Sequence, residues 1–376
     1  TLTGTDINAE QLQAALIDYD DVVIGQGGIA TLDESVEIPA GATLQNTGRM
    51  TIDEAQSLTI KGTLNNSGAI ENDGTIVNNS PNSFNHKSGA TIYGSGSIVN
   101  NGEMTISGTI SRDLPEGGSG SGYSLRLMAS ATADIAGMTL RAENAAEQPA
   151  EGEEPGEEPG EENEEAEAED KPLIVPVARI TNSSSGTLTI TAGANIHESE
   201  LSAAINNRGK LNMDGGTITA TGEEADVYGV YNYGKSAVFT MTGGAITATG
   251  GSAGAYGVWN YGAFNMDGGT ITATAEIPDG LEYGVCNYGE NATFTMSGGR
   301  VEGLWCGVYF DGGTFNFNAG TLITHREDGA DGVGFCYHEG SESSANEPCT
   351  HLTGLTTVPS GSGDDDNGTY YYVTKP

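Results

Sequence analysis

The second half of this sequence is an internal repeat, and that repeat limits the folds open to the chain more than any other feature. Each copy joins a block of the form Tyr-Gly-Val-x-Asn-Tyr-Gly to a block of the form Phe-x-Met-x-Gly-Gly-x-Ile. Steps of 25, 28, 27 and 23 residues separate the equivalent positions Ile205, Val230, Val258, Val285 and Val308. One such unit cannot bury an apolar face by itself, so neighbouring copies must stack to form a continuous core.

Each repeat contains three short segments in which apolar and polar residues alternate, separated by glycine-rich corners. Alternation rich in Thr, Val, Ile, Phe and Tyr predicts β-strands, and Gly-Gly pairs predict tight turns. Crossovers between parallel strands are right-handed in nearly all proteins. We therefore expect an all-β chain that forms a single right-handed parallel β-helix, a solenoid with three short strands per coil.

The alternation also assigns the residues that face the interior of the coils. Asn207, Asn232, Asn260 and Asn287 share the interior parity of the valines. Side-chain amides stacked at one position can hydrogen-bond from coil to coil, so we interpret these four as a structural amide ladder. The other expected interior positions are Val230, Val258, Val285, Val308, Met213, Met241, Met266, Met296, Phe317, Ile218, Ile246, Ile271, Val301 and Leu322.

The first half carries shorter coils, and its N-terminal segment differs from the repeats. Residues 6–18 have apolar positions on one helical face, with Asp6 or Asn8 as the N-cap. A helix laid over the first coil would block its open strand edge, and Val22 to Ile24 would be the first strand. The expected organisation is a capping helix in residues 1–20, β-helix in 21–146 and 173–335, and a C-terminal cap and exit linker in 336–376.

Residues 147–172 form an acidic insert between the two halves. The segment from Glu147 to Asp170 contains 13 acids and no bases, a composition typical of a disordered, self-repelling loop. The whole chain has 52 acids against 14 bases and a formal net charge of −38. That charge disfavours nucleic-acid and anionic-membrane partners, which attract Lys and Arg, and no apolar run is long enough for membrane insertion.

The outward columns hold the candidate ligand-binding residues. Tyr231, Trp259 and Tyr309 share one column. Rings one coil apart would form a flat strip suited to the apolar faces of sugars, or they are cross-strand pairs that only stabilise the sheet. A second column two residues further along contains Tyr233, Tyr261 and Tyr288. Outward Thr-x-Thr pairs in the same repeats are interpreted as exposed sheet positions, which threonine suits.

Asp214 and Asp267 are the candidate catalytic residues. They share an outward column two coils apart, which predicts a separation of about 9.6 Å from the strand spacing. Inverting glycosidases hold their carboxyl groups about 6.5–9.5 Å apart. Each Asp directly precedes Gly-Gly, however, where Asp is an ordinary turn residue, and we favour that interpretation.

The four cysteines give two alternatives near the C-terminus. Cys336, His338, Cys349 and His351 are candidate zinc ligands. Alternatively, Cys336 and Cys349 form a disulfide, which we favour for a secreted chain. Cys286 and Cys306 lie on adjacent coils but out of column, so we expect free thiols there. No cofactor is expected, because no phosphate loop, metalloprotease helix or nucleophile elbow is found.

The two repeated blocks resemble those of right-handed β-helix surface proteins of Gram-positive bacteria, especially gut species. The segments Ala9 to Leu16 and Val36 to Leu44 are similar to the start of pectin-lyase-like β-helices. For an active lyase the resemblance implies a calcium-binding Asp cluster and a basic Arg or Lys, and for a hydrolase a group of three Asp. Neither set can be placed on this sequence.

We therefore predict a non-catalytic, extracellular cell-surface protein, a stalk or adhesin with carbohydrate contact through its outward aromatic columns. The expected partner is a host or dietary glycan or a surface protein, and the expected state is a monomer. The alternatives are a polysaccharide lyase or glycoside hydrolase of the pectin-lyase-like superfamily, and a spacer without a ligand. Because the chain begins at Thr1 rather than Met, we expect a mature or excised fragment.

Overall fold

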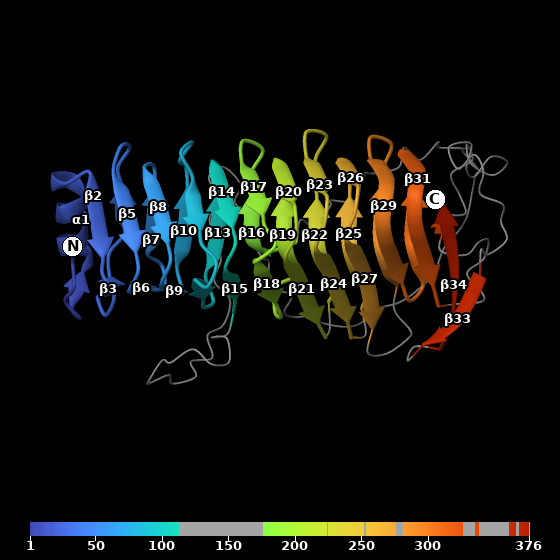
Figure 1. Ribbon diagram of the computed structural model, residues 1–376, viewed down its shortest axis with the longest axis horizontal. Helices are drawn as coiled ribbons and strands as arrows, with labels where there is room; N and C mark the ends of the chain where they lie inside the picture. Colours follow the sequence, from blue (N-terminus) through green and yellow to red (C-terminus); the bar gives the residue numbers. More distant parts are fainter. Residues whose placement is uncertain are drawn as a thin grey trace, which may run out of the picture. The chain divides into compact units, whose positions relative to one another are not determined.

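The chain winds into coils of three strands, and the strands of successive coils lie side by side in sequence order (Figure 1). The computed structural model describes residues 1–112 and 176–325, except 224, 252 and 276–280, and the backbone of 335–337, 361–365 and 368–375. Within these residues the fold is the expected right-handed parallel β-helix. We name the three stacks of strands row 1, row 2 and row 3, in the order in which a coil visits them.

Each coil contributes one strand to each row, and two long strands near the C-terminus run through both row 1 and row 2. Row 1 contains β2 (Asp21–Ile24), β5 (Thr43–Asn46), β8 (Thr63–Asn66), β11 (Phe84–His86), β14 (Glu103–Ile106), β17 (Thr187–Ile190), β20 (Lys210–Met213), β23 (Val238–Met241) and β26 (Ala263–Met266). Row 2 contains β1 (Ile7–Asn8), β3 (Ile29–Leu32), β6 (Arg49–Ile52), β9 (Ala69–Asn72), β12 (Thr91–Tyr93), β15 (Thr109–Ser111), β18 (Asn195–Glu198), β21 (Thr217–Gly222), β24 (Ala245–Gly250) and β27 (Thr270–Ala275). The strands shared by both rows are β29 (Thr293–Gly303) and β31 (Thr314–Thr324).

Row 3 is a separate sheet of 11 strands, whereas rows 1 and 2 join through β29 and β31 and, together with two C-terminal strands described below, form a sheet of 23. Row 3 contains β4 (Val36–Ile38), β7 (Ser57–Ile60), β10 (Thr75–Asn78), β13 (Ser97–Asn100), β16 (Ala178–Asn182), β19 (Ala203–Asn207), β22 (Val227–Asn232), β25 (Ala255–Asn260), β28 (Glu282–Tyr288), β30 (Cys306–Asp311) and β32 (Phe335–Tyr337).

The interior of the coils is filled by columns of like residues. Every position that alternation assigns to the interior is buried, including the valine, methionine and isoleucine columns. Phe239, Phe264, Phe294 and Phe315 also stack inside row 1, with ring centroids 4.6, 4.8 and 4.9 Å apart and planes within 8° of parallel. Identical side chains at one strand spacing explain why the repeat holds one register.

The predicted amide ladder is confirmed, and it is longer than expected. Nδ2 of each asparagine donates to Oδ1 of the next at 2.7–2.8 Å. The same Nδ2 group also donates to a backbone carbonyl of the following coil, and so does that of the last residue, Asn287, which donates to Gly312 O at 3.0 Å. The buried amides are therefore hydrogen-bonded, as buried polar groups must be. This long amide ladder consists of Asn78, Asn100, Asn182, Asn207, Asn232, Asn260 and Asn287.

The N-terminus covers the open edge of all three rows. Helix α1 (Ala9–Asp18) begins after Asn8, which caps it in a reciprocal capping box with Gln11, so the second of the two expected N-caps is correct. The side-chain amide of Gln13 pairs with the backbone of Glu37 at 2.7 and 3.0 Å, like a neighbouring strand residue. The first strand is β1 rather than Val22–Ile24, because Ile7 and Asn8 pair with β3 before the helix begins.

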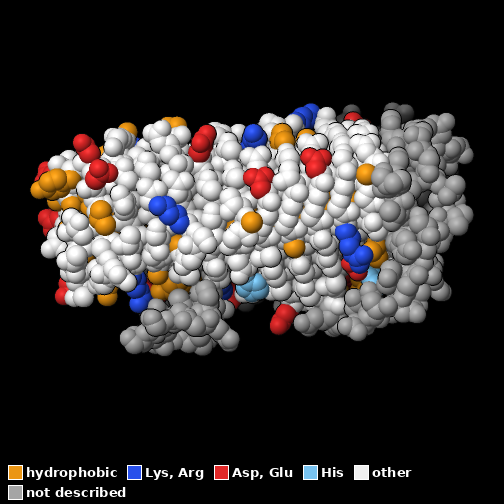
Figure 2. Space-filling model, in the orientation of Figure 1, with side chains coloured by type: hydrophobic (Ala, Val, Ile, Leu, Met, Phe, Trp, Pro, Cys, Tyr) orange, Lys and Arg blue, Asp and Glu red, His pale blue; other side chains and the backbone are white. Residues whose placement is uncertain are grey.

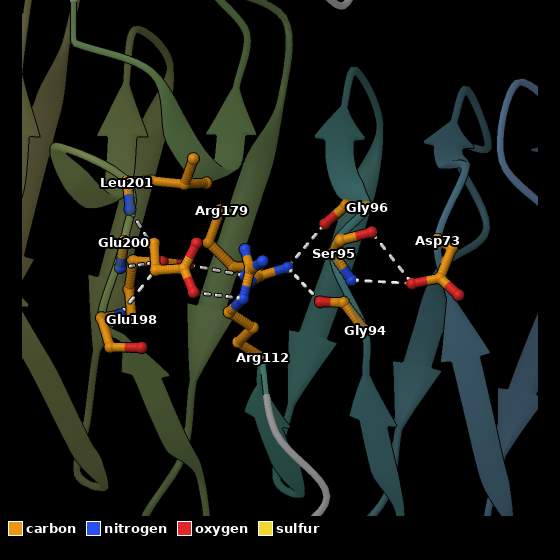
Figure 3. A network of polar contacts seen from close by, with 10 residues as sticks. Asp73, Gly94, Ser95, Gly96, Arg112, Arg179, Glu198, Glu200 and Leu201 are labelled. Atoms are coloured by element: carbon orange, nitrogen blue, oxygen red, sulfur yellow. Dashed lines mark hydrogen bonds and ion pairs between the residues drawn. The ribbon is translucent and has the colours of Figure 1, made fainter. Parts of the chain in front are cut away.

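The coils continue across the position of the acidic insert. β13 pairs directly with β16, so the stack passes from Asn100 to Asn182 without an intervening coil. Arg179 follows this position and is buried with Glu198, with Nε and Oε2 2.8 Å apart (Figure 3). Arg179 Nη1 also donates to the carbonyls of Gly94 and Gly96 at 2.7 Å. Residues 113–146, expected as β-helix, and the insert 147–172 lie outside the described residues.

At the C-terminal end of the solenoid, the edge of β31 is paired with a strand that runs antiparallel to it. β34 (Gly368–Lys375) pairs antiparallel with β31, and β33 (Gly361–Asp365) pairs antiparallel with β34. The segment expected as a C-terminal cap and exit linker therefore includes two antiparallel strands, of which β34 pairs with the last long strand of the solenoid.

Candidate functional site

The outward face of row 3 carries the predicted aromatic column near its C-terminal end. Tyr231 pairs with Trp259, Trp259 with Cys286, and Cys286 with Tyr309. Tyr233, Tyr261 and Tyr288 follow the same strands two residues later. The structure therefore brings together all six residues proposed from the sequence as ligand contacts.

A third aromatic column lies beside these two and was missed by strict alternation. Tyr228, Tyr256 and Tyr283 are in register with one another, and their rings pack against the other outward aromatics rather than in the core. The reason is local: Gly229 and Val230 both face the interior, which turns the preceding tyrosine outward. A Cβ at Gly229 would lie 2.4 Å from Ile246 Cγ2, so only glycine fits there.

We call these nine residues the aromatic surface. Its rings do not form the flat strip expected from the sequence, because most neighbours meet at steep angles. Tyr256 and Trp259 meet at 80°, and Tyr261 and Tyr288 at 62°. Edge-to-face packing of this kind contributes about 0.5–1.5 kcal/mol per pair beyond burial, so the cluster stabilises the sheet by itself. The members are Tyr228, Tyr231, Tyr233, Tyr256, Trp259, Tyr261, Tyr283, Tyr288 and Tyr309.

Exposure grades across the aromatic surface from one side to the other. Tyr231 and Tyr256 are 2% and 4% exposed, whereas Tyr288 is 37% exposed. Burial raises the pKa of Tyr228, Tyr256 and Tyr283, so these phenols stay protonated and can donate hydrogen bonds. Trp259 Nε1 and the Tyr261 hydroxyl lie close together, without the geometry of a hydrogen bond.

A groove of about 630 Å³ adjoins the aromatic surface at the corner between rows 2 and 3. We call it the corner groove. Asp226 joins the two features: its Oδ1 accepts from Gly254 N at 2.9 Å, and its Oδ2 lies 3.5 Å from the Tyr228 hydroxyl. The groove is lined by Ser199, Glu200, Leu201, Ser202, Thr221, Gly222, Glu223, Ala225, Asp226, Val227, Thr249 and Gly250.

The candidate catalytic pair occupies exposed turns. Asp214 follows β20 and Asp267 follows β26, and Thr242 lies between them in the same column. Thr242 Oγ1 donates to Asp214 Oδ1 at 3.2 Å, a side-chain contact between adjacent coils. Neither carboxylate lines the corner groove.

The outward threonines of row 2 are in register over three coils. Thr219, Thr247 and Thr272 form one column. A second contains Thr221, Thr249 and Thr274, in which the hydroxyls of Thr249 and Thr274 lie 3.3 Å apart. Across the middle of the face in Figure 2 most side chains are uncharged and polar, and charged groups are scattered singly.

The cysteines depart from expectation at one position. Cys286 is a buried free thiol whose pKa is raised by burial, as expected of its column. Cys306 is disulfide-bonded, which corrects the expectation of a second free thiol. The proposed Cys336–Cys349 disulfide and the alternative zinc ligands Cys336, His338, Cys349 and His351 lie outside the residues with described side chains. Elsewhere among the described residues, no group of three or more His, Cys, Asp or Glu is arranged as a metal site.

Comparisons of the chain with protein-family models, with characterised proteins and with solved structures give no match. Within the described part of the chain, no helix has the length and hydropathy that a membrane span needs.

Proposed function

We propose that this chain is a non-catalytic surface protein, a β-helical stalk or adhesin that contacts glycans through the aromatic surface. The observation that carries the proposal is the gathering of nine aromatic side chains on the outside of four consecutive coils of one row. Sugar rings present apolar faces that stack on aromatic side chains, and the tyrosine hydroxyls can bind the sugar hydroxyls. In the earlier coils, the strands of row 3 carry Thr, Val and Asn at the equivalent outward positions.

The position of these aromatics also argues for binding. A column that only stabilised the sheet could be built from Thr and Val, as it is in β10 and β13. Here the strands lengthen from four residues in β10 to six in β22 and β25 and seven in β28, and the added residues include the third tyrosine column. Partly exposed rings on its open side, such as Tyr288, would be the contact residues.

An extracellular location fits two further observations. Cys306 is disulfide-bonded, and stable disulfides form mainly in oxidising compartments. The net charge of −38 keeps such a surface soluble and away from nucleic acids and anionic lipids. The repeated blocks support the finer assignment, a pectin-lyase-like surface protein of a Gram-positive bacterium, acting as a monomer on a host or dietary glycan or surface protein.

Glycan-array binding tests the proposal. Trp259→Ala and Tyr288→Ala should each weaken binding about 5- to 150-fold, if a sugar ring stacks on one aromatic side chain as strongly as a nucleic-acid base does, by about 1–3 kcal/mol. Tyr19→Ala removes a 66% exposed tyrosine at the end of α1 and should leave binding unchanged. Far-UV circular dichroism of every variant would report whether the solenoid is intact.

Two results would refute the proposal. If glycan binding on the array is unchanged by both Trp259→Ala and Tyr288→Ala, the aromatic surface is not the binding site. Release of reducing ends or unsaturated products from a polysaccharide would replace the adhesin with the alternative, a lyase or hydrolase of the same superfamily.

A further inference from the structure

We propose that the corner groove is the hydrogen-bonding part of the glycan site, and that it selects neutral oligosaccharides over acidic ones. This inference rests on the proposed function. The groove supplies hydroxyl and carboxylate groups, and the aromatic surface beside it supplies rings, so one sugar chain could use both.

The corner between rows 2 and 3 lengthens toward the second half of the chain when it is measured between the inward-facing residues on its two sides. Ile70 and Ile76 are six positions apart, and Met50 and Leu58 are eight apart. Ile196 and Ile205 are nine apart, and the pairs Ile218–Val230 and Ile246–Val258 in the following coils are each twelve apart. The longer coils of 25 and 28 residues therefore place their extra residues where the groove forms.

The groove and the aromatic surface meet at Asp226. Its carboxylate accepts a hydrogen bond from Gly254 N and lies near the Tyr228 hydroxyl. Asp226 therefore links the two adjacent corners. Tyr256 reaches the same place: a Cβ at Gly254 would lie 2.6 Å from its hydroxyl. The hydroxyl ends of two tyrosines from the aromatic surface thus lie near Asp226, which lines the groove, although neither tyrosine lines it directly.

The lining chemistry fits a neutral, hydroxyl-rich ligand. Ser199, Ser202, Thr221 and Thr249 can donate and accept hydrogen bonds, and carboxylates accept them from sugar hydroxyls. Among the described lining residues there is no Lys or Arg, while three are acidic: Glu200, Glu223 and Asp226. Arg112 pairs with Glu200 at the edge of this lining, with Nε and Oε1 2.8 Å apart. A uronate or sulfate would therefore meet a lining that carries three carboxylates and contributes no Lys or Arg of its own.

The groove also has the size of a ligand site. Pockets for small molecules span about 300–1,000 Å³, and the corner groove falls within that range. Its walls come from three consecutive coils, so an extended oligosaccharide would lie across the strands rather than along one of them.

The deciding experiment compares matched threonine pairs. The double variant Thr221→Val with Thr249→Val removes two groove hydroxyls, whereas Thr219→Val with Thr247→Val makes the same changes on the same strands in a column that does not line the groove. Titration with neutral galactose oligosaccharides and with oligogalacturonides would be followed by tyrosine and tryptophan fluorescence. We expect at least tenfold weaker neutral binding for the groove pair, no change for the control pair, and at least tenfold weaker wild-type binding of the oligogalacturonides.

Each other outcome separates the two proposals. If Trp259→Ala abolishes binding but the groove pair binds as the control pair does, the groove is not part of the site and the aromatic proposal stands. If oligogalacturonides bind as tightly as neutral sugars, the charge selection is wrong. If no neutral or acidic glycan binds, or if Trp259→Ala leaves the affinity unchanged, both the glycan proposal and this inference are refuted.

Discussion

His86 is a buried histidine whose protonation should make the solenoid acid-sensitive. It ends a short amide ladder in row 1, in which Asn46 donates to Asn66 at 2.8 Å and Asn66 faces His86 Nδ1 at 3.0 Å. Because Asn66 Oδ1 accepts from Asn46, its Nδ2 is the group that donates to His86 Nδ1. The other ring nitrogen, Nε2, then carries the proton and donates to Thr109 O at 3.0 Å.

A second proton on His86 would break this arrangement, because Nδ1 would become a donor facing a donor. Burial lowers the pKa of His86 to about 4 from its usual 6.5, although the hydrogen bond to Thr109 O acts in the opposite direction. The difference of about 2.5 pKa units corresponds to about 3 kcal/mol at 1.36 kcal/mol per unit.

The sign follows from which state binds the proton. Between pH 6.5 and 4 the unfolded chain takes up a proton at this histidine and the folded chain does not. The stability associated with neutral His86 is therefore complete above pH 6.5, falls as the pH drops through this window, and is lost below pH 4.

The variant His86→Asn tests this reasoning, because an asparagine at this position would extend the short amide ladder without a titratable group. Urea unfolding of both proteins at pH 7.5, 5.5 and 4 would give the difference in unfolding free energy at each pH. We expect that difference to shift in favour of the variant by about 3 kcal/mol from the highest to the lowest pH. His86→Phe, which also cannot titrate but leaves Asn66 without its acceptor, should show the same pH shift and lower stability throughout. Free-energy differences independent of pH would refute the assignment of a neutral, buried His86.

Four further outcomes follow from other contacts. Gln13→Ala should expose the edge of row 3, lower stability by about 1–3 kcal/mol and increase light scattering on storage; an unchanged scattering profile would contradict the capping role. Gly229→Ala should cost about 2 kcal/mol or more in chemical unfolding, because the added Cβ would lie 2.4 Å from Ile246 Cγ2 in the core. A neutral effect would mean that Gly229 does not face the interior. Glu198→Ala should lower the free energy of unfolding by about 3–5 kcal/mol, because Arg179 would stay buried without its partner. A decrease no larger than that for an exposed ion pair would contradict this reasoning. Peptide mapping without reduction should recover Cys306 in a cross-linked peptide and Cys286 as a thiol alkylated only after unfolding; a freely alkylated Cys306 would overturn the bond.

The parts of the fold that follow from a local period were predictable from the sequence. A period of two residues fixes which side of a strand each side chain takes, and a repeat of constant pattern fixes which residues stack. The three strands per coil, the buried Val, Met and Ile columns and the Asn207–Asn287 part of the long amide ladder all follow from these two regularities. The six expected aromatic positions were found in the same way.

The site required information that no local period contains. Gly229 interrupts the alternation, and only its close contact with Ile246 shows why Tyr228 turns outward. The corner groove depends on how three coils of unequal length pack at one corner, and its residues carry no repeated motif.

The sequence by itself thus determined the repeating cross-section: which residues point inward, and which amides and rings stack. Tertiary structure decided where that regularity is broken. It placed β1 ahead of the helix, carried the stack directly from β13 to β16, tilted the aromatic rings into an edge-to-face cluster and opened a groove beside them. The physical reason is that stacking energy repeats with the sequence, whereas edges, corners and insertions depend on contacts between residues far apart in the chain.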